Sequence, residues 1–254
     1  MSNSTLSSPA IIFAKTVDIY VPSLKKILSF KNLTVKQYKT CLTMRFNIEE
    51  AADETTELFK FVVYLAEIVQ ENCLSSESSK VLLADLPAII LKLRAFSDDK
   101  LAINTPDQGI LEIALESHIK LKTEQLPSFV PSQEIKNEVA TVTLTAPTLE
   151  EYVMLAKAIE QLAGKNTEPG DVFLIDFVKF LSKISNKDKS VNIDFRSLPL
   201  ADQLEIVYSL DFSLILNSKD FIKQHRAFFN HFLYFDKFQQ PILLDLTPRL
   251  FTGL

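Results

Sequence analysis

The sequence predicts an α+β fold that is mainly helical, with an N-terminal β-hairpin and a small central antiparallel β region. Two patterns support this prediction: apolar and polar residues alternate near the N-terminus and again in the middle of the chain, and elsewhere apolar residues recur at helical spacing. Hydrophobic residues make up 47% of the 254 residues and charged residues 23%, which is sufficient for a buried core.

The N-terminal hairpin is predicted from a period of two. Residues 17–21 and 28–31 each alternate in this way, and the short connection 22–26 between them carries the basic pair Lys25 and Lys26. Thr34 and Gln37 then have the spacing of a capping box, which predicts a helix to about residue 44 and a second helix over 51–72.

A serine-rich stretch at 75–79 predicts a loop before the third helix. Asp85 is the expected N-cap of that helix, with Pro87 in its first turn, and the helix is expected to continue over 88–96. Residues 110–121 then alternate again, which predicts a one-sided strand with His118 on its solvent side. The β-branched run 139–145 predicts another strand.

The C-terminal part is predicted to be helical. Thr148 and Glu151 form a second capping box for a helix that ends near Gly164, and a further helix is expected over 171–184. The run 191–195 is expected to be extended, and Ser197 to cap a helix from about residue 199. The last helix is expected over 218–238, with aromatic side chains on more than one face. Those side chains either lie inside the core or contact another protein.

These elements divide the chain into four segments. Residues 1–14 are expected to be a flexible tail, 15–97 a hairpin with helices, and 98–147 a small β region. Residues 148–254 form a helical region that either stands alone or joins 15–97 in one compact domain.

Composition argues against several classes of protein. A net charge of −5 and a pI near 5.4 argue against nucleic acid as a partner. No apolar run is long enough to span a membrane, and the N-terminus lacks the pattern of a signal peptide, so the protein is expected in the cytoplasm without a membrane partner. Cys41 and Cys73 fall on predicted helices and are expected to be reduced.

No motif for chemistry is present, so the protein is expected not to be an enzyme. The four glycines form neither a dinucleotide-binding motif nor a phosphate-binding loop. His225 and His231 are six residues apart and lack further ligands at metal-site spacing, so no metal and no cofactor are expected. Adjacent carboxylates such as Glu49 and Glu50 point in different directions and do not form an acid–base pair.

The hairpin and the following helix carry a more specific signal. The run VDIYVPSLKK at 17–26, continued by LSFKNLTVKQ at 28–37, resembles the opening of the baseplate hub assembly family of T-even-type phages. Weaker similarities follow at 93–97 and 191–200. Some relatives carry a cysteine-rich insertion in the β region, but this chain has no cysteine after Cys73, so a metal role is not carried over.

The resemblance implies a non-enzymatic assembly factor, or chaperone, for the baseplate hub. Such a protein would bind hub or tape-measure proteins in the host cytoplasm, with a homo-oligomer left open. The alternatives are a structural component retained in the virion and an unrecognised hydrolase. The hypothesised contacts with partner proteins lie on the hairpin and the last helix: Ile19, Tyr20, Pro22, Lys25, Lys26, Phe30, Phe221, Phe228, Phe232 and Phe235.

Overall fold

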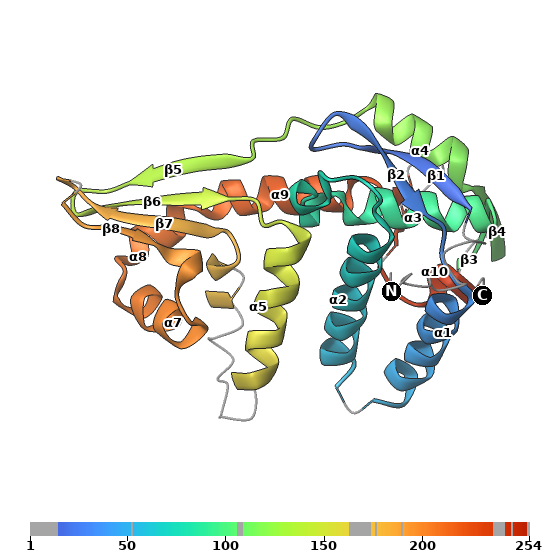
Figure 1. Ribbon diagram of the computed structural model, residues 1–254, viewed down its shortest axis with the longest axis horizontal. Coiled ribbons are helices and arrows are strands. Elements are labelled where there is room, and N and C mark those ends of the chain that lie inside the picture. The colour runs from blue at the N-terminus through green and yellow to red at the C-terminus, as the bar shows by residue number, and fades with distance from the viewer. Residues whose placement is uncertain are drawn as a thin grey trace, which may run out of the picture.

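Two lobes lie along the long axis of the molecule, and helix α9 (Lys219–His231) bridges them (Figure 1). The computed structural model describes residues 15–51, 53–105, 109–162, 174–175, 177–188, 190–235, 242–244 and 246–252. Both lobes combine helices with antiparallel strands, which confirms the predicted α+β class.

The first lobe is mostly helical. Its elements are β1 (Thr16–Val21), β2 (Lys26–Lys31), α1 (Val35–Glu50), α2 (Glu54–Asn72), η2 (Ser78–Lys80), η3 (Leu83–Asp85), α3 (Leu86–Ser97), β3 (Lys100–Thr105), β4 (Gly109–Ala114) and α4 (Leu115–Glu124). The short elements β9 (Tyr234–Phe235), β10 (Ile242–Leu243) and α10 (Arg249–Thr252) bring the C-terminal part of the chain back to this lobe.

Helix α3 forms the centre of the first core. Its residues from Leu86 to Leu91 are all buried, as expected for a helix that is apolar on every side. Arg94 is buried in the same helix with its polar atoms satisfied. Its Nε donates to the carbonyl oxygen of Leu250 at 2.9 Å, and its guanidinium pairs with Asp98 at 3.2 Å. This bond fixes α10 against α3.

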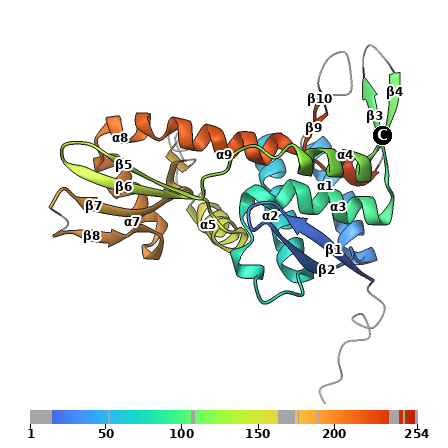
Figure 2. The same cartoon turned by 90° about the horizontal axis from the view of Figure 1, so that it is seen from above.

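Two hairpins project from the first lobe on the same side, β3–β4 and β9–β10 (Figure 2). The base of β3–β4 is anchored in the core, because Leu101 pairs with Ile113 and both side chains are buried. On the other face of the hairpin, Lys100 and Glu112 form an exposed ion pair of 3.2 Å, and Ile110, near the tip, is exposed.

The second lobe is built on an antiparallel sheet of order β5-β6-β7-β8, with β5 (Ser132–Lys136), β6 (Ala140–Thr145), β7 (Leu181–Asn186) and β8 (Asn192–Asp194). It also contains η4 (Phe195–Ser197), α7 (Leu200–Ser209) and α8 (Phe212–Asn217). Its core is separate from that of the first lobe and includes Leu144, Phe177, Phe195 and Phe221. The sheet therefore takes two strands from before helix α5 (Leu149–Leu162) and two from after it.

The N-terminal hairpin is confirmed, although β2 begins at Lys26, inside the predicted connection. β1 and β2 pair antiparallel with Val17 opposite Phe30 and Val21 opposite Lys26. The turn places Lys25 at φ 52°, in the left-handed region that costs a residue with a side chain about 1 kcal/mol or more. The capping box of Thr34 and Gln37 is also present, and α1 continues six residues beyond the predicted end at Met44.

The predicted strand over 110–121 is wrong in its second half. β4 ends at Ala114, and helix α4 begins at Leu115. On this helix Leu115, His118 and Lys122 share the buried face, so His118 does not lie on a solvent side. Its ring stacks on Phe235 with 3.8 Å between centroids, and its Nε2 lies 2.7 Å from the carbonyl oxygen of Phe232. Leu115 and Ile119 fit a period of two and a helical period equally well, so contacts with distant residues decided the outcome.

The predicted helix over 171–184 is also wrong at its end, where residues 181–186 form strand β7. The pairing of β6 with β7 shifts between Thr143 and Leu144, so Ser182 is an extra residue in the ladder. The resulting bulge puts Leu181 and Ile184 on the same buried face. Their spacing of three residues therefore resembles that of a helix.

The last helix is shorter than predicted. It ends at His231, and Tyr234 and Phe235 pair with β10 instead. Within α9, Phe221, His225 and Phe228 form one buried stripe at spacings of four and three. Phe229, adjacent to Phe228 on α9, packs against the first core, so aromatic side chains do lie on more than one face of the helix; the other aromatics of the predicted helix follow its end.

Two predicted caps are corrected. Asp85 occupies the N-cap position of α3, but its side chain binds the hairpin turn. Ser197 precedes α7, whose N-cap is Pro199, and its hydroxyl donates to the carbonyl oxygen of Asp194. The loop at 75–79 and the extended run at 191–195 agree broadly with the structure. The predicted tail 1–14, the cap at Gly164 and the start of the helix predicted from 171 lie outside the described residues.

Candidate functional site at the junction of the lobes

The junction of the two lobes is formed by helices that contribute to both cores. On α5, Leu149 and Val153 pack into the first core, and Leu155 and Ile159 pack against the second. On the other connection, Phe221 near the start of α9 belongs to the second core, and Phe232 just after its end belongs to the first. The lobes are thus joined by continuous packing.

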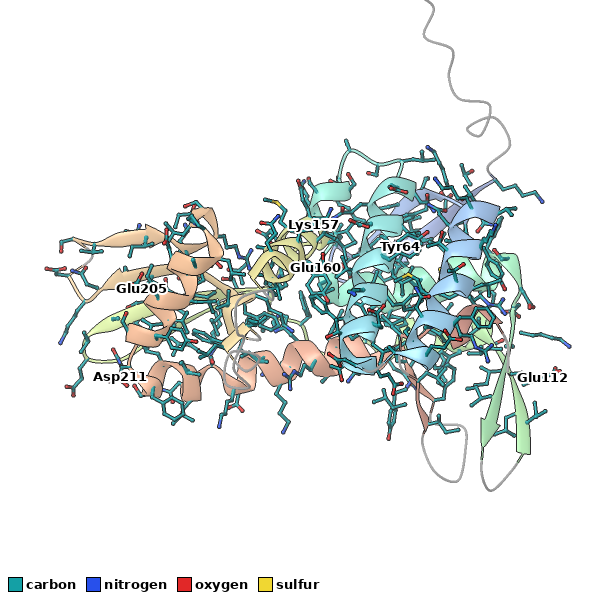
Figure 3. All side chains as sticks on the ribbon, turned by 90° about the horizontal axis from the view of Figure 1, so that it is seen from below. Tyr64, Glu112, Lys157, Glu160, Glu205 and Asp211 are labelled. Atoms are coloured by element: carbon teal, nitrogen blue, oxygen red, sulfur yellow. The ribbon has the colours of Figure 1, made fainter. Side chains whose placement is uncertain are left out.

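Helix α5 also contacts α2 of the first lobe. Lys157 pairs with Glu67 across the contact at 2.8 Å, and the rings of Phe59 and Tyr152 meet edge to face with 6.1 Å between centroids. Figure 3 shows Lys157 and Glu160 on α5 close to the α1–α2 pair that carries Tyr64.

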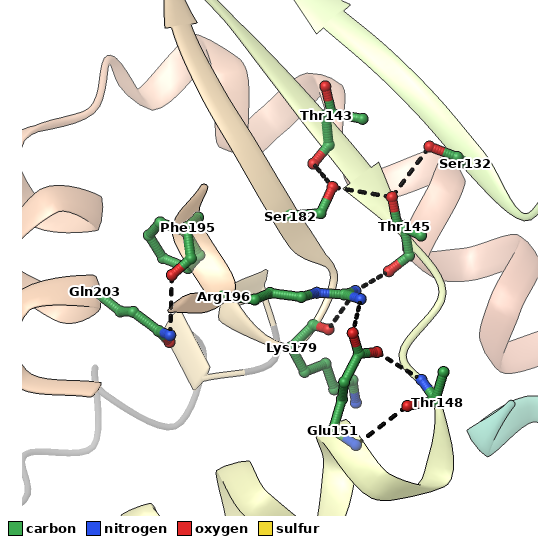
Figure 4. Close-up of polar contacts among 10 residues, drawn as sticks. All are labelled: Ser132, Thr143, Thr145, Thr148, Glu151, Lys179, Ser182, Phe195, Arg196 and Gln203. Atoms are coloured by element: carbon green, nitrogen blue, oxygen red, sulfur yellow. Dashed lines mark hydrogen bonds and ion pairs between the residues drawn. The ribbon is translucent and has the colours of Figure 1, made fainter. Parts of the chain in front are cut away.

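Arg196 connects the sheet of the second lobe to the start of α5 (Figure 4). Its Nη1 donates to Oε1 of Glu151 at 2.7 Å, and its Nη2 donates to the carbonyl oxygen of Thr145 at the end of β6, at 2.6 Å. The fixed fork of a guanidinium suits this arrangement, since one group reaches a carboxylate and a backbone carbonyl at the same time. Arg196 therefore fixes the angle at which the chain leaves the sheet and enters the helix.

The carboxylate of Glu151 has two roles in this network. Its Oε2 accepts from the backbone N–H of Thr148 at 2.8 Å, and Thr148 Oγ1 accepts from the N–H of Glu151 at 3.2 Å, which confirms the predicted capping box. The same carboxylate holds Arg196 through its other oxygen. Next to it, Ser182 at the bulge donates to the carbonyl oxygen of Thr143 at 3.0 Å, so the irregular part of the sheet is hydrogen-bonded.

A cavity of about 220 Å³ lies at the junction, partly open to solvent. It is bordered by α2, η3, the start of α5, residues 179–180 and α9. Val62, Leu83, Pro147 and Phe229 contribute apolar surface, and Lys179, Arg226 and Asn230 contribute polar groups. His225 also borders this cavity, and only 4% of the residue is exposed.

His225 is held rigidly in one orientation. Its Nδ1 lies 2.8 Å from the carbonyl oxygen of Phe221, and the rings of Phe129, Phe180 and Phe221 surround it at centroid distances of 5.0, 5.3 and 4.0 Å. Burial lowers the pKa of His225, so the ring is neutral at pH 7. Nε2 has no hydrogen-bond partner among the residues that the structure describes.

The described residues show no group of three or more potential metal ligands. Cys41 and Cys73 are both free thiols; Cys41 is buried, which raises its pKa to about 12, and Cys73 is half-buried. In the described part of the chain, no helix has the length and apolar character required to cross a membrane.

Most of the residues hypothesised to contact a partner are buried. Ile19, Pro22, Phe30, Phe221, Phe228, Phe232 and Phe235 lie inside the protein, where they hold its own elements together. Tyr20 is half-buried, Lys25 is exposed, and Lys26 is exposed and pairs with Glu77 at 2.8 Å. Direct contact with a partner stays a prediction, and on this structure Tyr20, Lys25 and Lys26 are the members of the set that a partner can reach.

A comparison with protein families places the chain. The family model described as T4 bacteriophage base plate protein matches residues 14–231, which is most of the chain. This chain belongs to the T4 base plate protein family. The comparison confirms the baseplate part of the resemblance noted in the sequence, without distinguishing an assembly factor from a structural component. Searches of curated proteins and of solved structures find no significant match.

Sequence reasoning missed two residues at the junction of this base plate protein. Arg196 gave no local signal, because its partners Thr145 and Glu151 lie about fifty residues away in the chain. His225 was considered only as a metal ligand. A signal was nevertheless present: a histidine four residues after Phe221 and three before Phe228 continues an apolar helical stripe, and this spacing is typical of a buried ring.

Proposed function

We propose that this base plate protein is a non-enzymatic assembly factor that binds baseplate hub or tape-measure proteins during tail assembly in the host cytoplasm. The family relationship supports a role in the baseplate. The observation that carries the binding role is a group of exposed apolar side chains at the end of the second lobe farthest from the first. We call this group the distal tip: Val139, Val191, Tyr208, Phe212 and Leu216.

Hydrogen bonds bring the parts of the distal tip together. The N–H of Lys187 donates to the carbonyl oxygen of Val139 at 3.1 Å, which joins the β5–β6 turn to the β7–β8 turn that carries Val191. The side chain of Asn137 in the first turn bonds Ser213 on α8 at 3.3 Å. The turn thus lies beside the helix that presents Phe212.

The distal tip exposes two aromatic side chains together with aliphatic ones. Tyr208 and Phe212 are 62% and 61% exposed, and Val139 is 68% exposed. Single exposed apolar residues are common on soluble proteins, but a contiguous group marks a surface for another protein. Aromatic side chains are also enriched among the residues that contribute most to binding at interfaces. Such a surface could cover apolar patches of hub proteins before they assemble.

The proposal is tested by co-expressing the chain with each hub protein and each tape-measure protein of the same phage and separating the complexes by size exclusion. We expect co-migration with at least one of them. Replacing Phe212 and Val139 by Glu should abolish it, because charged side chains at the centre of an apolar interface remain without partners after desolvation.

The matched control is Val35→Glu, a substitution at an apolar residue of α1 that is 87% exposed and lies in the other lobe. This variant should co-migrate as the wild type does. If the wild type co-migrates with none of the candidates, or if both variants behave alike, the distal tip is not the binding surface. Mass spectrometry of purified virions separates the two roles in the baseplate, since an assembly factor is absent from the particle and a structural component is retained.

A further inference from the structure

Helix α7 presents acidic side chains beside the apolar ones of the distal tip. One side of this helix, with Gln203 and Val207, is buried. The opposite side is exposed and carries Asp202, Glu205 and Tyr208. Glu205 is three residues from each of the other two, so its side chain is a neighbour of both on the helix surface.

Helix α8 continues this arrangement. Asp211 caps the helix, and its Oδ1 accepts from the N–H of Ser213 at 2.8 Å, which holds the carboxylate at the start of the helix that presents Phe212. Hydrogen bonds from Ser213 lower the pKa of Asp211, so this group is ionised at neutral pH. Figure 3 shows Glu205 on α7 and Asp211 at the start of α8, both in the second lobe. The two helices thus present both carboxylates and exposed aromatic rings.

These helices carry no basic residue that balances the charge, since the stretch 197–218 has no lysine, arginine or histidine. Within the part of the chain that the structure describes, neither Asp202 nor Glu205 forms an ion pair. The adjacent strand β5 differs, because its Glu134 and Lys136 pair with each other at 2.9 Å. We call the acidic and apolar surface of the two helices the α7–α8 face: Asp202, Glu205, Tyr208, Asp211, Phe212 and Leu216.

The charge of the α7–α8 face determines which partner it favours. Complementary charge around an apolar interface increases the rate of association and rejects partners of like charge. An acidic partner would place its carboxylates opposite Asp202 and Glu205, which is unfavourable. A second copy of this chain is disfavoured as well, since each copy has a net charge of −5. Arginine suits the surface better than lysine, because a guanidinium can form two parallel hydrogen bonds with a carboxylate and can stack on aromatic rings.

We propose that the α7–α8 face binds a basic segment of a baseplate partner, in which arginine side chains stand beside apolar ones. The arginines pair with Asp202 and Glu205, and the apolar side chains cover Phe212 and Leu216, which are 61% and 41% exposed. The identity of the partner rests on the proposed function, whereas the charge of the segment follows from the surface itself.

The test uses the full chain and three synthetic peptides that share their apolar residues and differ only at the polar positions, which carry arginine, glutamine or glutamate. Each peptide also contains a tryptophan. Because the chain has no tryptophan, the fluorescence of the peptide reports binding without interference. We expect the arginine peptide to bind most tightly and the glutamate peptide most weakly. In about 1 M salt these differences should shrink, since charges are then screened beyond about 3 Å.

The Asp202→Asn/Glu205→Gln variant removes two charges and keeps the shape of both side chains. It should bind the arginine peptide roughly tenfold more weakly, because each exposed ion pair contributes a factor of about two to five. The matched control is Glu54→Gln/Glu124→Gln, which removes the same charge from exposed residues of α2 and α4 in the first lobe. This control should bind the arginine peptide as tightly as the wild type does.

Three results would overturn the proposal. Equal binding of the peptides, or binding of none, would show that the carboxylates serve only to keep an exposed apolar surface soluble. Equal weakening by both variants would attribute the preference to net charge alone. Dimerisation of the wild type that the Asp202→Asn/Glu205→Gln variant loses, measured by analytical ultracentrifugation, would make a second copy the occupant.

This test and the co-migration experiment can fail independently. A preference for the arginine peptide without co-migration would keep the basic chemistry and refute the proposed partner. Co-migration that Asp202→Asn/Glu205→Gln leaves unchanged would keep the assembly role and remove the basic segment.

Discussion

Stability of the protein should depend on pH through one buried carboxyl group. Asp85 has no exposed surface and accepts three hydrogen bonds: from the N–H of Ser23 at 2.8 Å, from the hydroxyl of Ser23 at 2.6 Å, and from the N–H of Leu82 at 3.1 Å. These bonds tie the turn of the N-terminal hairpin to the start of α3. The Pro-Ser dipeptide at 22–23 belongs to the run VDIYVPSLKK on which the family resemblance is based, and these bonds give it a structural role.

Burial raises the pKa of Asp85 from 3.8 to about 6, although the three hydrogen bonds lower it in part. Because one pKa unit corresponds to about 1.4 kcal/mol, the ionised group costs the folded state about 3 kcal/mol relative to the protonated group. The folded protein binds more protons than the unfolded chain between pH 4 and pH 6. The stabilisation from protonated Asp85 is therefore fully present below about pH 4 and is lost as the pH rises through about 6.

The Asp85→Asn variant isolates this effect, because an amide of nearly the same shape does not titrate. Unfolding free energies from urea titrations are compared for the variant and the wild type at several pH values from about 4 to about 7. The unfolding free energy of the variant minus that of the wild type should increase by about 3 kcal/mol from the lowest to the highest of these pH values, whatever the size of this difference at any single pH.

Ser23→Ala adds a second measurement. This change removes one hydrogen bond to the carboxylate, so it should raise the pKa of Asp85 further and move the loss of stability to higher pH. Ser79→Ala, at an exposed serine of η2, is the control and should leave the pH profile unchanged. A free-energy difference between Asp85→Asn and wild type that stays constant with pH, or that shifts in the opposite direction, would refute the reasoning.

Three further predictions concern the junction and the core. Arg196→Ala should lower the unfolding free energy by about 1–3 kcal/mol in urea titrations, because the carbonyl oxygen of Thr145 and the carboxylate of Glu151 lose a charged donor. Arg196→Lys should recover only part of this loss. Full recovery of the unfolding free energy by lysine would contradict a role for the guanidinium fork. Phe232→Ala should cost about 3–5 kcal/mol by leaving a cavity in the first core, and a cost below about 1 kcal/mol would show that the site is not packed as described. Cys41 should not react with a thiol reagent in the native protein, because the residue is not exposed and burial raises its pKa to about 12. In urea the same thiol should react. Rapid labelling of Cys41 in the native protein would contradict its burial.

Part of the fold was predictable because it depends on neighbours in sequence. The hairpin 16–31 follows from a period of two, and the capping boxes at Thr34 and Thr148 depend on a residue three positions later. The starts of α1 and α5 were predicted to within two residues for the same reason, and the start of α7 was predicted equally well although Ser197 does not cap it.

Other elements could not be predicted because two structures fit the same local pattern. The stretch 115–121 satisfies both periods, and contacts with residues more than one hundred positions away, such as that of His118 with Phe235, favour the helix. In β7 a bulge at Ser182 makes two strand residues look helical, and that bulge exists only in the pairing with β6. The candidate site shares this property, since the partners of Arg196 and the elements around His225 come from separate parts of the chain.

By itself, then, the sequence determined the α+β class, the N-terminal hairpin, two helix starts with their caps, and the features that resemble baseplate proteins. These depend on hydrogen bonds and periodicities within a few residues. The tertiary structure alone decided that Asp85 binds the hairpin turn, that Arg196 connects the end of β6 to the start of α5, and that α5 and α9 join two cores. The physical reason is that burial and hydrogen-bond partners depend on which distant segments meet, and one-dimensional spacing carries no information about such contacts.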